Sequence, residues 1–241
     1  MASTDVHFLQ CSRDGTTIPL KPKKDTGIEI TAVILLTVGR AIINNLAVKF
    51  WLGDLPVRPF GYFQFTECLR GIFLAGLVLF VVWLKKESWT EIGLTTTIPV
   101  KDLMVALLLI FTTTLIWILF ASTIESLRLY VFQKPPIPFA SASTTVDWLW
   151  ICVTAIIVGF GEELLIRGYL LSRLLRVCRP LSSVIYSSLV FSVWHISQGL
   201  FMLAHTFIWG LVYGWTFIKI RRLYPFVLAH AINNVIAYLW T

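Results

Sequence analysis

Seven long apolar stretches constrain this chain more than any other feature of its sequence. A helix needs about 20 mostly apolar residues to cross the hydrocarbon core of a bilayer. Stretches of that length, or slightly shorter, lie at residues 28–48, 62–84, 103–122, 147–172, 181–196, 200–218 and 225–240. The sequence therefore predicts an all-α, polytopic bundle of about seven transmembrane helices.

The composition agrees with a multi-pass integral membrane protein. Hydrophobic residues make up 57% of the 241 residues and charged residues 14%, against about 45–50% and about 25% in an average soluble domain. So little polar surface cannot cover a water-soluble globule, which excludes a cytosolic enzyme, a disordered regulator and a secreted disulfide scaffold. We attribute the net charge of +7 to cytoplasmic loops and infer no nucleic-acid partner.

The distribution of Lys and Arg predicts the orientation. If the N-terminus is cytoplasmic, the loops on that side carry thirteen Lys and Arg residues and the opposite loops carry four. Cytoplasmic loops are normally the ones enriched in these residues, so residues 1–27 are predicted to form a cytoplasmic tail. An eighth or re-entrant helix would have room in residues 89–100 or 122–146. We expect a cell (inner or plasma) membrane, or the endoplasmic reticulum in a eukaryote.

Two adjacent carboxylates and a guanidinium lie deep in the fourth predicted span, in Gly161-Glu162-Glu163-Leu164-Leu165-Ile166-Arg167. Ionisable side chains inside a span are costly and are candidates for function. Glu163 and Arg167 are spaced i,i+4, share a helix face and are predicted to form an ion pair. Glu162 points about 100° away around the helix and lacks that partner, which suits a general base.

Three further polar residues lie at matching depths in later spans. His195 follows Phe191 in the fifth span, and His230 and Asn234 lie in the seventh. The spacing of His230 and Asn234 places both on one helix face, whereas Asn233 points elsewhere. Together with Glu162, these groups on three helices predict one polar site inside the membrane.

The sixth span contributes less to this site. Gly210 and Gly214 form a GxxxG ridge, which lets a neighbouring backbone come close. His205 lies deep enough to reach the site, but its helix face carries no second polar group. We assign it an indirect role behind the site.

The polar residues of the first two spans are interpreted as structural. Arg40, Asn44 and Asn45 lie at near-helical spacing, and Glu67 and Arg70 form an i,i+3 pair. An internal ion pair, or side chains that reach toward the interface, accounts for them.

The motifs of residues 147–240 resemble one known family. Glu162-Glu163-x-x-x-Arg167, Phe191-x-x-x-His195 and His230-x-x-x-Asn234, in this order and with a GxxxG helix between the last two, are similar to the CPBP family of intramembrane proteases. This family is also called Abi or type II CAAX prenyl endopeptidases. In the first half, only apolar spans and the segment Trp89-Thr90-Glu91-Ile92-Gly93-Leu94 resemble it. The resemblance divides the chain into N-terminal transmembrane helices at 28–146 and catalytic core helices at 147–241.

The resemblance implies an intramembrane endopeptidase that uses a glutamate and no metal or other cofactor. Glu162 would activate a water molecule, His195 would position that water or share its proton, and His230 and Asn234 would bind the oxyanion. Glu163 and Arg167 would hold the helix and tune Glu162, with Phe191 behind them, whereas His205 departs from the family pattern. The substrate would be a membrane-associated peptide or protein, either a CAAX-like tail or a sorting tail.

Three alternatives remain open at this point. Two His residues and a Glu suit a zinc metallopeptidase, although HExxH is absent. A scaffold or immunity-type protein of the same family would keep the bundle without hydrolysis. A transporter would use buried Glu and His as proton relays, but the chain has no internal repeat. No P-loop motif occurs, so we infer no nucleotide partner.

The orientation can be tested by cysteine labelling. Lys85 and Arg221 should face the cytoplasm and Lys134 the opposite side, because of the excess of Lys and Arg in the assigned cytoplasmic loops. Each position is replaced by Cys in a background without the four native cysteines, and intact cells are treated with an impermeant maleimide. Only position 134 should react; labelling at 221 but not at 134 would reverse the topology.

Overall fold

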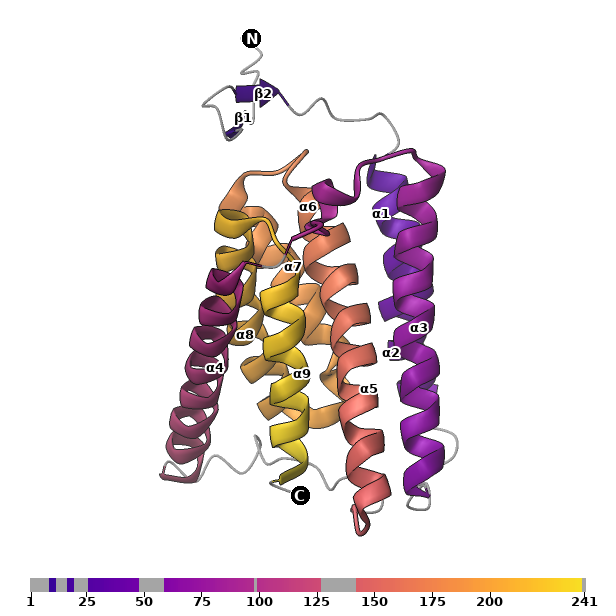
Figure 1. The fold of residues 1–241 in the computed structure, drawn as a ribbon, viewed down its shortest axis with the longest axis vertical. Helices are drawn as coiled ribbons and strands as arrows, with labels where there is room; N and C mark the ends of the chain where they lie inside the picture. Colours follow the sequence, from indigo (N-terminus) through magenta and orange to yellow (C-terminus); the bar gives the residue numbers. More distant parts are fainter. Residues whose placement is uncertain are drawn as a thin grey trace.

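The computed structural model describes residues 9–11, 17–19, 26–47, 59–97, 99–126 and 142–239. These ranges contain seven continuous helical segments, which stand side by side in one bundle (Figure 1). The first consists of α1 (Thr26–Ile34), the π-helix η1 (Leu35–Gly39) and α2 (Arg40–Ala47). The fourth consists of α5 (Thr145–Glu163), the π-helix η5 (Leu164–Leu171) and α6 (Ser172–Leu174). The others are α3 (Phe60–Leu84), α4 (Val100–Ser126), α7 (Pro180–Trp194), α8 (Gly199–Ile220) and α9 (Tyr224–Leu239).

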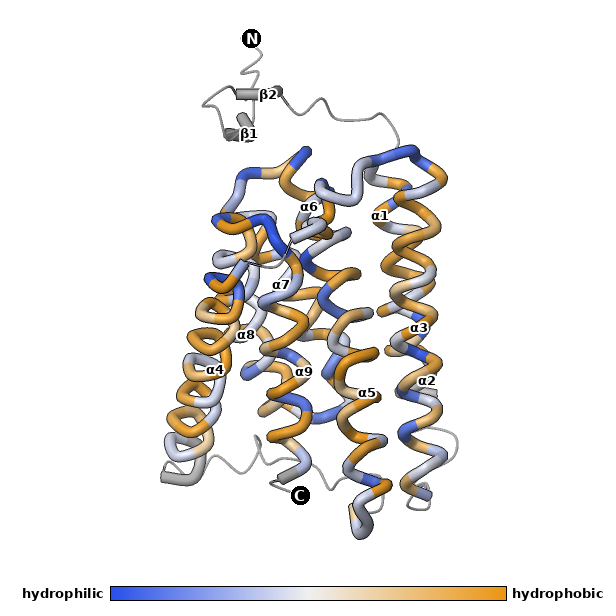
Figure 2. Tube along the Cα trace, in the orientation of Figure 1, coloured by the Kyte–Doolittle hydropathy of each residue, from blue (hydrophilic) through white to orange (hydrophobic). Residues whose placement is uncertain are grey.

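The all-α prediction is confirmed, and each predicted span corresponds to one of these segments. By length and composition, five segments are long and apolar enough to cross a membrane. The segments containing α7 and α9 are shorter, at 15 and 16 residues, or about 22 and 24 Å. The prediction of about seven spans, some of them slightly short, is therefore met by five long helices and two short ones. Figure 2 shows hydrophobic residues over most of the helices, with short hydrophilic stretches inside the bundle.

No eighth helix of membrane-spanning length occurs in the described ranges. Between α3 and α4 there is only the 3-10 helix η3 (Trp89–Ile92). In the other candidate region, 122–146, α4 continues to Ser126 and α5 begins at Thr145, while residues 127–141, including Lys134, lie outside the description. Two three-residue strands, β1 (Leu9–Cys11) and β2 (Thr17–Pro19), form an antiparallel pair in the predicted N-terminal tail.

A close helix crossing joins the two halves of the chain. α3 packs against α5, and a Cβ at Gly161 would lie only 2.5 Å from the carbonyl oxygen of Gly71. A Cβ at Gly71 would lie 2.9 Å from the backbone oxygen of Ile157. Only glycine at both positions lets the two backbones approach this closely. The crossing lies next to Arg70 and Glu162 in sequence and thereby sets the distance between those side chains.

A second close crossing involves the GxxxG ridge. α8 packs against α7, and a Cβ at Gly210 would lie 2.8 Å from the Cβ of Ser188. A Cβ at Gly214 would lie 3.1 Å from the side chain of Val184. The predicted structural role of this ridge is confirmed, since it brings α8 against the helix that leads to His195.

The Trp89–Leu94 segment docks the N-terminal half onto the later helices. Ser88 caps η3, and Gly93 ends it in the left-handed region at φ 81°. Ile92 is fully buried, and its carbonyl oxygen lies 2.9 Å from where a Cβ of Gly168 would be. The Gly93 carbonyl accepts a hydrogen bond of 2.9 Å from the backbone N–H of Leu223. The Trp89–Leu94 segment therefore forms an interhelical contact.

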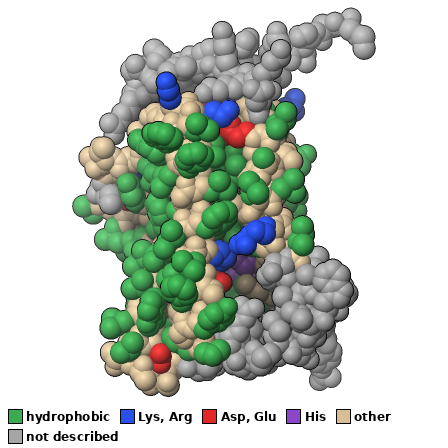
Figure 3. Space-filling view, turned by 90° about the vertical axis from the view of Figure 1, so that its right-hand side faces the viewer, with side chains coloured by type: hydrophobic (Ala, Val, Ile, Leu, Met, Phe, Trp, Pro, Cys, Tyr) green, Lys and Arg blue, Asp and Glu red, His purple; other side chains and the backbone are tan. Residues whose placement is uncertain are grey.

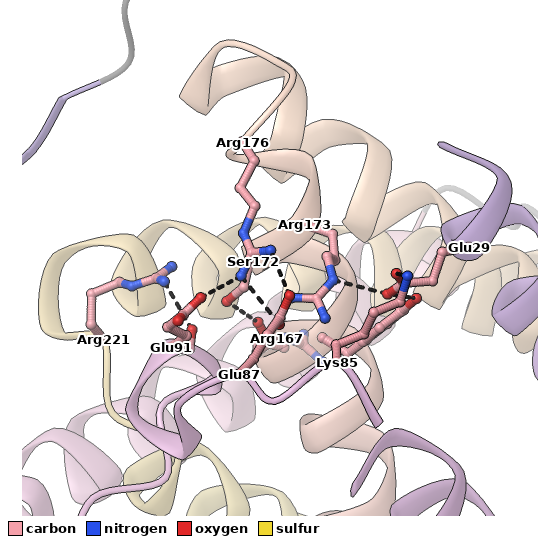
Figure 4. A network of polar contacts seen from close by, with 10 residues as sticks. Glu29, Lys85, Glu87, Glu91, Arg167, Ser172, Arg173, Arg176 and Arg221 are labelled. Atoms are coloured by element: carbon pink, nitrogen blue, oxygen red, sulfur yellow. Dashed lines mark hydrogen bonds and ion pairs between the residues drawn. The ribbon is translucent and has the colours of Figure 1, made fainter. Parts of the chain in front are cut away.

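Ion pairs reinforce the same end of the bundle (Figure 4). Glu29 of α1 accepts from Arg173 Nε at 3.1 Å. Glu87 lies 2.6 Å from Arg173 and 3.1 Å from Arg176, and Glu91 also pairs with Arg176. Lys85, Tyr169 and Arg221 belong to the same network. We call this end of the bundle the basic end; it contains Lys85 and Arg221, which were predicted to lie on one side.

A methyl group at the α3–α5 crossing should loosen the fold. Gly161→Ala places its Cβ against the Gly71 backbone, and we expect a loss of about 1–3 kcal/mol, as for other overpacked sites. Thermal unfolding of the purified protein in detergent measures it as a lower Tm. Gly76→Ala on α3 is the matched control, because nothing lies within 4 Å of a Cβ there. Equal Tm values for the two variants would contradict this description of the crossing.

Candidate active site

Glu162 lies inside the bundle and is held by an arginine of α3. Its side chain is 5% exposed, and Arg70 Nη1 donates to Glu162 Oε1 at 2.8 Å. Arg70 also donates to Glu67 Oε2, from Nε at 2.9 Å and from Nη2 at 2.6 Å. The predicted Glu67–Arg70 pair is present, but its interpretation as purely structural was incomplete. Arg70 is shared between a carboxylate of its own helix and Glu162.

Glu163 and Arg167 form the ion pair that their spacing predicted. Arg167 Nη1 donates to Glu163 Oε1 at 3.0 Å, and the side chains are 1% and 0% exposed. The Arg167 guanidinium also lies 4.6 Å from the ring centre of Phe191 and 5.1 Å from that of Tyr213. An ion pair this deeply buried needs such additional contacts, because neither charge is hydrated.

His230 of α9 lies between the two carboxylates. Its Nδ1 is 2.7 Å from Glu163 Oε1, and its Nε2 is 3.7 Å from Glu162 Oε2. A carboxylate only accepts hydrogen bonds, so Nδ1 carries the proton. The Nε2 atom of His230 thereby points toward Glu162. The contact between His230 and Glu163 also joins α9 to α5 next to the site.

His195 lies at the end of α7, where the helix gives way to the 3-10 helix η6 (Ile196–Gln198). Its Nδ1 is 2.8 Å from the carbonyl oxygen of Phe191. The Phe191 ring is fully buried and lies 4.9 Å from the His195 ring and 6.2 Å from the His230 ring, centre to centre. The structure therefore brings Glu162, His195 and His230 together around Phe191.

The two asparagines of α9 differ in their surroundings. Asn233 Nδ2 donates to Thr113 Oγ1 of α4 at 2.9 Å and lies 3.4 Å from the Tyr213 hydroxyl. It thus faces α4 and α8, as its spacing suggested. Asn234 lies one turn beyond His230, is partly exposed, and makes no hydrogen bond to the described residues. Its amide is available to a ligand.

His205 does not enter the site directly. The residue is 4% exposed, and neither ring nitrogen has a hydrogen-bond partner within the described ranges. Its ring centre lies 5.0 Å from that of Trp117 and 6.0 Å from that of Trp209, and Trp209 lies 5.0 Å from His230. Among the site residues, His205 therefore contacts His230 only through Trp209.

Sequence reasoning missed Arg70 as a partner of Glu162. The available signal was depth: counted from the basic end, Arg70 lies about 21 Å from Leu84 and Glu162 about 18 Å from Leu174. Arg40 lies over Phe73 at 5.7 Å, and the side chains of Asn44 and Asn45 lie outside the description. No group of three or more His, Cys, Asp or Glu side chains able to hold a metal ion occurs in the described ranges.

Comparison with known proteins places this site in a family. Residues 144–236 match the family model described as Rce1-like, type II CAAX prenyl endopeptidase Rce1-like. The match contains the motifs of Glu162, His195 and His230, and it confirms the resemblance to the CPBP (Abi) family over this range. No curated protein and no solved structure matches the chain.

Residues 144–236 are therefore similar to the Rce1-like, type II CAAX prenyl endopeptidase family, and they lie in a multi-pass membrane bundle. The Rce1-like family is a family of proteases, and the match implies an intramembrane protease of the CAAX type. It covers α5 to α9 for almost their whole length and leaves α1 to α4 outside it.

Removal of one partner of the buried pair should destabilise the protein. Arg167→Ala leaves Glu163 with a buried charge, and Glu163→Gln does the same to Arg167, at about 3–5 kcal/mol each. Glu162→Gln should be far milder, because Arg70 keeps Glu67 and the new amide oxygen still accepts. Membrane abundance and Tm of the three variants measure the difference. An equal loss in all three would mean that Glu162 and Glu163 have the same structural role.

Proposed function

We propose that this protein is a glutamate-dependent intramembrane endopeptidase, which hydrolyses a peptide bond in a membrane-associated substrate with a CAAX-like or sorting tail. The observation that carries the proposal is the asymmetric environment of Glu162. One of its oxygens is bonded to Arg70, and the other lies 3.7 Å from His230 without a hydrogen bond from the described residues. The family match supplies the reaction class.

Glu162 acts as the base through its unbonded oxygen. The ion pair with Arg70 fixes the carboxylate at Oε1, so that Oε2 points toward the space beside His230. A water molecule that donates to Oε2 loses its proton as its oxygen attacks the substrate carbonyl carbon. Burial of the carboxylate excludes competing bulk water and keeps this geometry fixed.

His195 holds the same water from a second side. The carbonyl of Phe191 accepts from Nδ1, so the neutral ring has its lone pair at Nε2. That nitrogen can accept a hydrogen bond from the attacking water or take its proton. Two acceptors then orient one water molecule, which is a positioning effect as well as a chemical one.

His230 and Asn234 stabilise the oxyanion. Because Glu163 binds Nδ1–H, Nε2 of His230 donates only when the ring is an imidazolium, which lies beside the carboxylates of both Glu162 and Glu163. Asn234 supplies a second N–H from the same helix face. Each donor of this kind contributes about 3–4 kcal/mol to the transition state.

The proton balance closes without another reactant. The water proton taken by Glu162 or His195 passes to the amide nitrogen as the C–N bond breaks. The second water proton leaves the new carboxyl group and protonates the released amine, so the products are a carboxylate on the upstream peptide and an ammonium group on the released tail. Arg70, Glu163 and Arg167 position these groups and do not exchange protons in this scheme.

Substitution of the four reacting groups tests the mechanism. Glu162→Gln, His195→Ala and His230→Ala should each remove most cleavage of a prenylated CAAX peptide by the purified protein. Asn234→Ala should lower kcat by about two to three orders of magnitude. Thr216→Val on α8 is the control, because its hydroxyl bonds only to the backbone of its own helix among the described residues. Tm values measured in parallel identify any loss that is due to unfolding.

Two outcomes would replace the proposal. Reversible loss of activity with phenanthroline, restored by zinc, would assign the reaction to a metallopeptidase that uses Glu162 and the two histidines. Full biological function of Glu162→Gln in cells would favour a scaffold of the same fold. Under the proposed mechanism, chelators leave the rate unchanged and Glu162→Gln is inactive.

A further inference from the structure

Arg40 is a charged residue that the proposed mechanism does not use. It is the first residue of α2, which packs against η6, the turn that follows His195. Its side chain is exposed, and its guanidinium lies 5.7 Å from the ring centre of Phe73 on α3. Phe73 is one helical turn from Arg70. Arg40 therefore lies beside the site, between α2 and α3.

Arg40 has no anionic partner in the described part of the chain. The structure gives it no ion pair and no hydrogen bond through its side chain, only the contact with Phe73. Arg70, by contrast, has both Glu67 and Glu162. An unpaired guanidinium inside a membrane span is costly, and a cation–π contact recovers only part of that cost.

The side chain of Arg40 extends along the bundle toward the basic end and not toward the nearer membrane interface. Arg40 lies about 21 Å along its helix from Thr26, and Phe73 lies about 16 Å from Leu84. Both reference residues are at the basic end of the bundle (Figure 1). The guanidinium over Phe73 is thus displaced toward the basic end, as the tilt of helical side chains requires. It does not extend toward the nearer interface beyond Ala47.

The surface at this position is hollowed. Figure 3 views the face that α1, α2 and α3 form and shows Lys and Arg side chains at mid-height beside a recess in which a histidine is visible. Arg40 and Arg70 are the Lys and Arg residues of the described parts of α1, α2 and α3. On this face, positively charged side chains therefore border a recess in which a histidine is visible (Figure 3).

We infer that Arg40 binds the C-terminal carboxylate of the substrate tail, so that the protein selects peptides that end shortly after the cleaved bond. This inference rests on the proposed function. A CAAX-type tail ends three residues after its cysteine, and three extended residues span about 10 Å. The Arg40 guanidinium lies near the residue that holds Glu162, because it contacts Phe73, which is one turn of α3 from Arg70.

Direct binding tests the inference independently of cleavage. The probe is a fluorescent peptide ending in S-farnesyl-Cys-Val-Ile-Met, made with a free carboxylate or a C-terminal carboxamide. Its anisotropy is measured with Glu162→Gln protein in phosphatidylcholine nanodiscs, which prevents turnover. The carboxylate should bind about tenfold more tightly than the carboxamide, as for one charge-assisted hydrogen-bonded pair. When Arg40→Gln is combined with Glu162→Gln, the ratio of the carboxamide Kd to the carboxylate Kd should fall to about one. Arg40→Lys in the same background should retain part of the preference for the carboxylate.

Lys219→Gln is the matched control. Lys219 is also exposed, lies 6.0 Å from the ring centre of Trp215 and is at the basic end of α8, away from the recess. Its substitution should leave the ratio unchanged. The protein with its native Glu162 is tested for cleavage of the same peptides. The cleavage assay then tests the proposed function, and the binding assay tests recognition of the carboxylate.

Each outcome decides the inference. A ratio that depends on Arg40 supports it even if neither peptide is cleaved, in which case the proposed function alone fails. Cleavage combined with a ratio that Arg40→Gln does not change overturns the role of Arg40 and leaves the function standing. Binding of neither peptide overturns the inference, and the cleavage assay then decides the proposed function by itself. Loss of the ratio when phosphatidylglycerol is added would assign Arg40 to a lipid phosphate and overturn the inference.

Discussion

The contact between α3 and α5 is the constraint on which the rest of the site depends. Two glycine backbones touch at Gly71 and Gly161, and the adjacent residues Arg70 and Glu162 form an ion pair of 2.8 Å. The energy of the pair falls steeply with separation in a medium of low dielectric constant. The Glu162 carboxylate can be buried here only because the close approach of the two backbones brings the Arg70 guanidinium next to it. Packing of small residues therefore makes the chemistry of the membrane interior feasible.

The N-terminal helices lie outside the family match but pack against the helices that it covers. α3 supplies Arg70, η3 fills the space beside Gly168, and three acidic residues pair with Arg173 and Arg176. These contacts lie at two levels, one at mid-depth and one at the basic end. The α1–α2 segment has fewer contacts to the later helices and is largely exposed along its length. The bundle thus has one firmly packed wall at α3 and one looser wall at α1 and α2.

Features determined by local spacing could be predicted from the sequence, whereas contacts between distant segments could not. The helix positions follow from apolar stretches, and the Glu163–Arg167 pair follows from i,i+4 geometry. Arg70 and Glu162 are 92 residues apart, and nothing in either helix alone specifies which faces meet. The π-helices η1 and η5 were also missed, since a change in helix register leaves the apolar pattern almost unaltered. The roles of His195 and Asn234 remain proposals that their positions support.

The shortness of α7 has a consequence for the surrounding lipid. At 15 residues it is about 8 Å shorter than a typical hydrocarbon core, and His195 lies where it stops. A helix of that length meets the bilayer by hydrophobic mismatch, so lipids beside it are drawn thinner. Under the proposed mechanism, thinner lipid beside His195 would shorten the path of water to the reacting groups, and we expect cleavage to slow in bilayers with longer acyl chains.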